Sequence, residues 1–136
     1  MVSTERMRSP KMGLKKVLIV DDSDDFRAML KDYLKRHHLG LEIFEASTGE
    51  MGVAKASCVR PDIVLMDINL PHANGFEATK HIQGDHPDCQ VIILTMFDVK
   101  VFKEAAEKIK VADFIGKSEI DERLLPAIKK CLAAKR

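Results

Sequence analysis

The sequence predicts an α/β fold in which five parallel strands alternate with helices that cover both faces of the sheet. Four-residue apolar runs occur at 17–20, 63–66 and 91–94, too short for helices and too uniformly apolar for strands with one wet face. Such runs are typical of parallel strands that are buried on both sides. Helical apolar patterns lie between and around these runs, and strands that alternate with helices over short connections wind into a doubly wound sheet.

The first helix is expected directly after the first strand. Its apolar residues recur at helical spacing and form one stripe: Phe26, Met29, Leu30, Tyr33 and Leu34. Ser23 is the expected cap of this helix, with Asp24 and Asp25 in the first turn, where acidic side chains favour the helix dipole. The chain of 136 residues fits one domain, which we expect over 15–136 after a flexible tail at 1–14.

The remaining elements complete five strand–helix repeats. A second strand is expected at 41–46, and Ser47 or Thr48 would cap a helix over 50–57. Further helices are expected at about 75–86 and 99–110, and a fifth strand at 112–115. The last helix carries a second apolar stripe and should hold Pro126 within its first turn. Its stripe consists of Leu124, Leu125, Ile128, Cys131 and Leu132.

Composition excludes several classes of function. The 22 basic and 21 acidic residues leave a net charge of +1, so no basic field predicts nucleic-acid binding. The strongly apolar runs are far shorter than the roughly 20 residues that cross a bilayer, so we expect no membrane association and a cytoplasmic location. Cys58, Cys89 and Cys131 lack metal-type spacing and are interpreted as reduced, apolar core residues.

Polar residues follow the buried strands, where parallel strands bring their carboxyl ends to one crevice. Asp21 and Asp22 follow the first strand, Asp67 the third, Thr95 the fourth and Lys117 the fifth. Clustered carboxylates repel one another unless a cation lies between them, and an all-oxygen donor set favours Mg²⁺. A lysine and a threonine directed to the same place suit an anionic phosphoryl group, and an aspartate there can act as a nucleophile.

Five motifs in order resemble the response-regulator receiver domain of two-component signalling, over nearly all of Lys15 to Leu132. They are the run VLIVDDS at 17–23, RPDIVLMD at 60–67, the loop DINLPHANG at 67–75, Thr95 and Lys117. The resemblance implies a flavodoxin-like (βα)5 fold with strand order 2-1-3-4-5. The segment LLPAI at 124–128 is most similar to receivers that precede helix-turn-helix output domains.

The resemblance also implies a role for each site residue. Asp67 would be the phosphoacceptor, Lys117 would neutralise the phosphoryl oxygens, and Thr95 would hydrogen-bond one of them. Thr95 and Phe114 would form the conformational switch. The implied cofactor is Mg²⁺, whose protein ligands would be Asp22, Asp67, the backbone carbonyl of Asn69 and, through a water molecule, Asp21.

The implied function is phosphorelay signal transduction. A phosphoryl group would come from a phosphohistidine on a sensor histidine kinase or phosphotransfer protein, and the domain would catalyse only its own phosphorylation and dephosphorylation. Output would leave through a homodimer or effector contact on the face built by the helix at 99–110, the strand at 112–115 and the last helix.

Three positions depart from the receiver pattern without removing a catalytic group. Met96 stands where a small residue is usual, Ser118 where a proline is frequent, and Lys110 where many receivers have a helix-ending glycine. Two alternative functions stay open: a receiver-like interaction module that works without phosphorylation, and a phosphatase with an aspartate nucleophile. The phosphatase signature places a second aspartate where this chain has Asn69, which argues against it.

Overall fold

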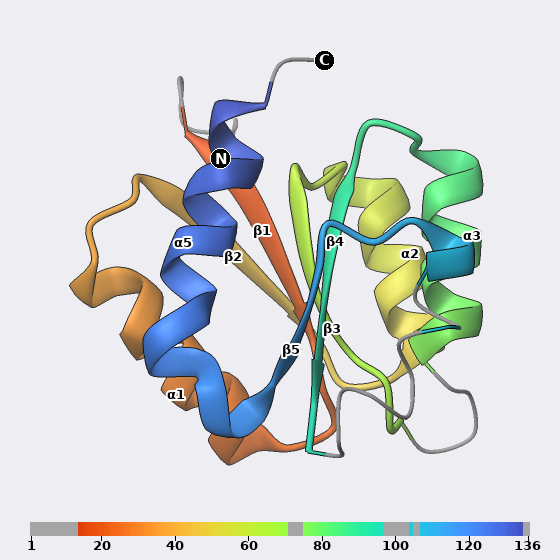
Figure 1. Cartoon of the computed structure of the whole chain (residues 1–136). Helices are drawn as coiled ribbons and strands as arrows, with labels where there is room; N and C mark the ends of the chain where they lie inside the picture. The colour runs from red at the N-terminus through yellow and green to blue at the C-terminus, as the bar shows by residue number, and fades with distance from the viewer. Residues whose placement is uncertain (1–13, 71–74, 97–103, 105–106, 135–136) are drawn as a thin grey trace, which may run out of the picture.

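A computed structural model describes residues 14–70, 75–96, 104 and 107–134 of the chain. Its centre is a five-stranded parallel sheet in the order β2-β1-β3-β4-β5, which confirms the predicted doubly wound topology (Figure 1). Each strand begins or ends within about two residues of the predicted position. The strands are β1 (Lys15–Val20), β2 (Leu41–Ala46), β3 (Ile63–Asp67), β4 (Gln90–Thr95) and β5 (Asp113–Gly116).

Helices cover both faces of the sheet. Helices α1 (Asp24–Arg36) and α5 (Ile120–Ala133) lie on one face, and α2 (Gly49–Val59) and α3 (Gly75–Asp85) lie on the other (Figure 1). A short 3₁₀ helix, Lys117–Glu119, joins β5 to α5. Of the helix expected at 99–110, the structure describes residue 104 and residues 107–109 as helical. The expected tail, apart from Leu14, lies outside the described residues.

The apolar runs are buried on both sides because alternate side chains of one strand point to opposite faces. Val17 and Ile19 of β1 belong to the core beneath α1 and α5, whereas Leu18 and Val20 belong to the core beneath α2 and α3. All five residues of β3 are buried. The sheet is thus a rigid support for the loops at its carboxyl edge.

The predicted capping residues are confirmed. Ser23 Oγ accepts a hydrogen bond of 3.1 Å from the backbone N–H of Phe26 at the start of α1. For α2, Thr48 rather than Ser47 is the cap, and its hydroxyl accepts from the N–H of Met51. Both caps satisfy a backbone donor that the helix itself leaves free.

Two predictions are wrong. Pro126 lies inside α5 rather than in its first turn, because the buried Ile120 extends the apolar stripe N-terminally and the helix begins there. Tyr33 contacts the same part of the helix: its hydroxyl donates to the carbonyl of Ile120 and accepts from the N–H of Leu125. Cys58 is exposed rather than buried, since it lies on the solvent side of α2; the other two cysteines are buried.

Lys110 forms the turn into β5 without the usual glycine. Its φ of 54° lies in the left-handed region that glycine adopts most readily. The missing glycine therefore changes the residue at this turn but leaves its left-handed conformation in place.

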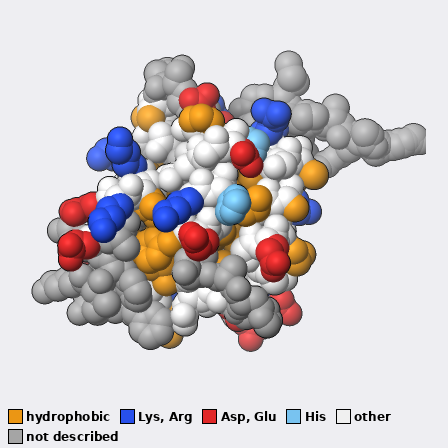
Figure 2. Space-filling view, turned by 90° about the vertical axis from the view of Figure 1, so that its right-hand side faces the viewer, with side chains coloured by type: hydrophobic (Ala, Val, Ile, Leu, Met, Phe, Trp, Pro, Cys, Tyr) orange, Lys and Arg blue, Asp and Glu red, His pale blue; other side chains and the backbone are white. Residues whose placement is uncertain are grey.

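The surface agrees with a nearly neutral chain. On the face shown in Figure 2, basic and acidic side chains lie among one another rather than in a field of one sign. Within the described residues, no helix is both long and apolar enough to cross a membrane.

Candidate functional site

Three carboxylates meet at the carboxyl edge of the sheet. Asp21 and Asp22 directly follow β1, and Asp67 is the last residue of the neighbouring strand β3. The two strands are parallel and in register, with Val20 opposite Met66, so the residues after them lie side by side. One oxygen from each of the three carboxylates lies within 4.8 Å of the others. The predicted acidic cluster is therefore assembled.

The cluster is mostly withdrawn from water. Asp21 is 2% exposed and Asp67 is 4% exposed, whereas Asp22 is open to solvent. Burial raises the pKa of Asp67, and the negative charges of Asp21 and Asp22 raise it further. A 3.0 Å hydrogen bond from the N–H of Asn69 and the positive charge of Lys117 oppose this rise. Asp67 thus lies where a cation or an additional positive charge is most favourable.

Lys117 brings a positive charge into the same crevice from the end of β5. Its ammonium lies 2.7 Å from Oδ2 of Asp21 and 3.7 Å from Oδ2 of Asp67, and its side chain is 10% exposed. Thr95 ends β4, opposite Gly116 in the strand register, and is fully buried. The structure therefore places the two predicted partners of a phosphoryl group at the same sheet edge as the acids.

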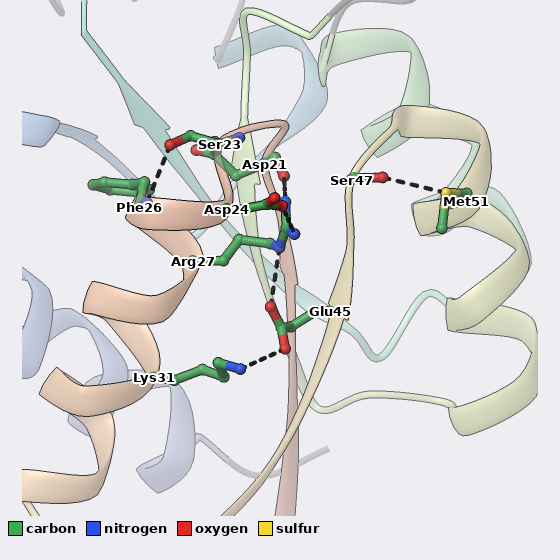
Figure 3. Close-up of polar contacts among 9 residues, drawn as sticks. All are labelled: Asp21, Ser23, Asp24, Phe26, Arg27, Lys31, Glu45, Ser47 and Met51. Atoms are coloured by element: carbon green, nitrogen blue, oxygen red, sulfur yellow. Dashed lines mark hydrogen bonds and ion pairs between the residues drawn. The ribbon is translucent and has the colours of Figure 1, made fainter.

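An arginine that the sequence analysis missed holds the loop between β1 and α1. Arg27 donates from Nη1 to the carbonyl oxygen of Asp21 at 2.6 Å and from Nε to Glu45 at 3.0 Å (Figure 3). Lys31 donates to the other oxygen of Glu45 at 2.7 Å. The bond from Lys31, and then that from Arg27, lower the pKa of Glu45. Sequence spacing gives the helical pair 27 and 31 but not their shared partner on β2.

Gly75 explains how closely α3 approaches the end of β3. Its N–H donates to the carbonyl of Ile68 at 2.8 Å, and a Cβ at this position would lie 2.2 Å from the carbonyl oxygen of Asp67. Only glycine fits this approach. The helix start therefore packs directly on the backbone of the acidic residue, although residues 71–74 of the connecting loop lie outside the described part of the chain.

Three more side chains surround the site. The Phe114 ring is 7% exposed and lies 6.3 Å from the ring of Phe76, centroid to centroid. Met96, directly after Thr95, is 76% exposed. Phe26 places its ring 3.9 Å from the Lys117 ammonium, a contact hidden in the sequence because Phe26 belongs to the apolar stripe of α1.

The donor set fits a hard divalent cation. Carboxylate oxygens converge from Asp21, Asp22 and Asp67, and one of the three acids faces solvent, where water can complete the coordination. The mutual repulsion of the three charges supplies a further reason for a cation to bind. The triad is consistent with a divalent metal site of the kind typical of receivers.

The fold and this site define a receiver domain. The chain matches the response regulator receiver domain over residues 17–129 and belongs to that family. It is a phospho-aspartate signalling domain with an acidic metal-binding pocket, not a conventional enzyme.

Relatives of this chain include both short and longer regulators. Chemotaxis protein CheY of Thermotoga maritima is 37% identical over 117 residues, which cover 85% of this chain and 96% of that protein. Protein PilH of Pseudomonas aeruginosa is 37% identical over 87% of this chain and 98% of its own length. Among solved structures, a LuxR-family two-component response regulator from Aurantimonas sp. SI85-9A1 superimposes with a TM-score of 0.82 at 28% identity, covering 90% of this chain and 88% of that one.

Proposed function

We propose that Asp67 accepts a phosphoryl group from a phosphohistidine on a sensor histidine kinase or phosphotransfer protein. The observation that carries this proposal is the position of Asp67: buried at the sheet edge, within 3.7 Å of the Lys117 ammonium and beside two further carboxylates. A carboxylate oxygen of Asp67 forms a bond to phosphorus while the bond from phosphorus to the histidine nitrogen breaks. The electron pair of that bond returns to the imidazole.

Lys117 and Thr95 have separate roles in this proposal. Lys117 gives a compact positive charge that offsets the charge on the phosphoryl oxygens, and Thr95 donates a hydroxyl hydrogen bond to one of them. Thr95 ends β4, which pairs with β3, and Lys117 follows β5, which pairs with β4. The Lys117 ammonium nevertheless lies 3.7 Å from Oδ2 of Asp67.

We propose Mg²⁺ as the resident cation, held by Asp22, Asp67 and the backbone carbonyl of Asn69, with Asp21 acting through a water molecule. When bound, the ion offsets negative charge on the transferring phosphoryl group. Asp22→Ala removes one of few direct ligands and should weaken Mg²⁺ binding by about tenfold or more in a calorimetric titration. Full phosphorylation of this variant at an unchanged Mg²⁺ concentration would contradict the assigned role.

The proposed output surface comprises α5, β5 and the helix expected at 99–110, as a contact with an effector or a second copy. On this face Arg123 of α5 donates to Asp113 of β5 at 2.9 Å and to Glu119 at 3.3 Å, so helix and strand are linked. Phe114 is already buried here. Phosphorylation would increase the population of the state in which Thr95 approaches the phosphoryl group and Phe114 stays inward. Amide hydrogen exchange that is identical between residues 95 and 120 in both states, with unchanged self-association and partner affinity, would rule this surface out.

The deciding experiment is incubation with Mg²⁺ and a small phosphodonor, followed by intact-mass measurement. A lasting addition of one phosphoryl group supports the proposal. No adduct would instead favour an interaction module that works without phosphorylation, and rapid multiple turnover would favour a phosphatase. We propose that this reaction takes place in the cytoplasm, where the receiver accepts the phosphoryl group from its kinase.

A further inference from the structure

The first turn of α1 supplies an aromatic surface to the Lys117 ammonium. The nitrogen lies 3.9 Å from the centroid of the Phe26 ring, well inside the distance of about 6 Å at which a cation is attracted to a π face. Phe26 is half-buried and Lys117 is nearly inaccessible to water, so the attraction is weakly screened.

Phe26 is held in this position by the acidic site itself. Asp21 accepts from Lys117 with Oδ2 and from the N–H of Ser23 with Oδ1 at 2.8 Å. Ser23 in turn accepts from the N–H of Phe26 as the cap of α1, and the Phe26 ring meets Lys117. The four residues thus form a closed ring of contacts, in which the helix cap fixes the backbone of the aromatic residue.

The aromatic ring of Phe26 supports Lys117 in a way that a second carboxylate would not. An aromatic face attracts the ammonium without accepting a directional hydrogen bond, so the N–H groups stay available to oxygen acceptors. Asp21 occupies one of these groups in the present structure, and Asp67 is within ion-pair distance. A lysine with an aromatic support can therefore turn toward a phosphoryl group without losing its position.

We propose that Phe26 is a positioning residue that holds Lys117 for phosphoryl transfer to Asp67, an inference that rests on the proposed function. A leucine at position 26 would keep most of the contact with the core beneath α1 and α5, but it has no π face. The purely structural alternative, in which Phe26 only fills this core, predicts that leucine and tyrosine behave alike in the transfer reaction.

The test compares Phe26→Leu with Phe26→Tyr, which retains the π face. We expect Phe26→Leu to slow phosphorylation by a small phosphodonor about fivefold, with Mg²⁺ affinity unchanged within about twofold, and Phe26→Tyr to restore the wild-type rate. Phe44→Leu, which removes a half-buried ring from β2 away from this crevice, is the matched control and should react like wild type. Denaturant unfolding of each variant verifies that it is folded at the assay temperature.

A second readout does not depend on phosphorylation. Ring currents of Phe26 should displace the proton resonances of the Lys117 ε-methylene in the wild type and in Phe26→Tyr, and Phe26→Leu should remove the displacement. Equal transfer rates for wild type and Phe26→Leu, or equal slowing by both Phe26 variants, overturn the inference alone. Absence of any adduct on the wild type overturns the proposed function and this inference with it, even where the resonance displacement is present.

Discussion

Nζ of Lys117 donates a 2.7 Å hydrogen bond to Oδ2 of Asp21, a residue 96 positions earlier in the chain. The bond joins the loop after β5 to the loop after β1 across the carboxyl edge of the sheet. Lys117 is therefore closer to Asp21 than to Asp67, its second acidic neighbour at 3.7 Å. A phosphoryl group on Asp67 would bring new oxygens into competition with Asp21 for this ammonium.

Asp67→Asn should raise the free energy of unfolding at neutral pH in the absence of divalent cations, by about 1 kcal/mol. The wild-type carboxylate is buried next to Asp21 and Asp22, which raises its pKa, so its ionised form is disfavoured in the folded state. Urea unfolding with a chelator measures the change, and Asp85→Asn on the exposed end of α3 is the control. Added Mg²⁺ should stabilise the wild type more than the variant; a variant less stable than the wild type without metal would contradict this reading.

Met96→Ala should accelerate both phosphorylation by small donors and autodephosphorylation. The side chain is 76% exposed directly after Thr95, at the rim where a donor or a water molecule would approach Asp67. A shorter side chain leaves that approach open in both directions, by a factor that we expect to be about two- to tenfold. Stopped-flow phosphorylation and decay of the adduct measure the two rates. If both are unchanged, the thioether points away from the approach.

Glu45→Gln should destabilise the protein at neutral pH by about 0.5–1 kcal/mol, because it weakens the bonds to Lys31 and Arg27. The pKa of Glu45 is lowered in the folded state, so its contribution is present above the pKa of the unfolded chain and is lost as pH falls through the folded value. The cost of the substitution should therefore shrink as the pH falls and disappear once Glu45 is protonated in the folded state as well. Urea unfolding from neutral to acidic pH measures this cost, and Glu107→Gln, at an exposed position, is the control. A cost that does not change with pH would show that packing rather than charge is responsible.

Lys110→Gly should stabilise the protein by about 0.5–1 kcal/mol, since the lysine holds a φ of 54° that glycine adopts at no steric cost. The same substitution two residues earlier, Lys108→Gly, replaces a helical residue and should destabilise by about 1 kcal/mol. Thermal unfolding of the two variants should therefore shift in opposite directions. A shift of both to lower temperature would show that the left-handed turn carries no strain.

The sequence is most informative where a pattern is both local and dense. The run at 63–66 has four consecutive apolar residues, so its strand is identifiable without knowledge of its neighbours. Asp67 directly after it, with Asp21 and Asp22 after another such run, follows from strand parallelism alone. The acidic pocket is therefore predictable from the positions of the strand ends.

Contacts between elements that are distant in the sequence cannot be predicted from such patterns. Arg27 and Phe26 occupy ordinary positions on an amphipathic helix. Only the tertiary structure reveals their partners, Glu45 on β2 and Lys117 after β5. The interior position of Pro126 has a similar cause, because proline statistics favour a first turn while the burial of Ile120 extends the helix. Tertiary burial outweighs the local preference in that case.

Phosphorylation of Asp67 is tested most directly by chemical identification of the modified residue. Borohydride reduces an acyl phosphate on aspartate to homoserine, so protein treated with Mg²⁺ and a small phosphodonor can be reduced, digested and analysed by tandem mass spectrometry. We expect homoserine at position 67 alone, and no homoserine anywhere in Asp67→Asn treated in the same way. Homoserine at Asp21 or Asp22 in the wild type, or an undiminished adduct on Asp67→Asn, would contradict it.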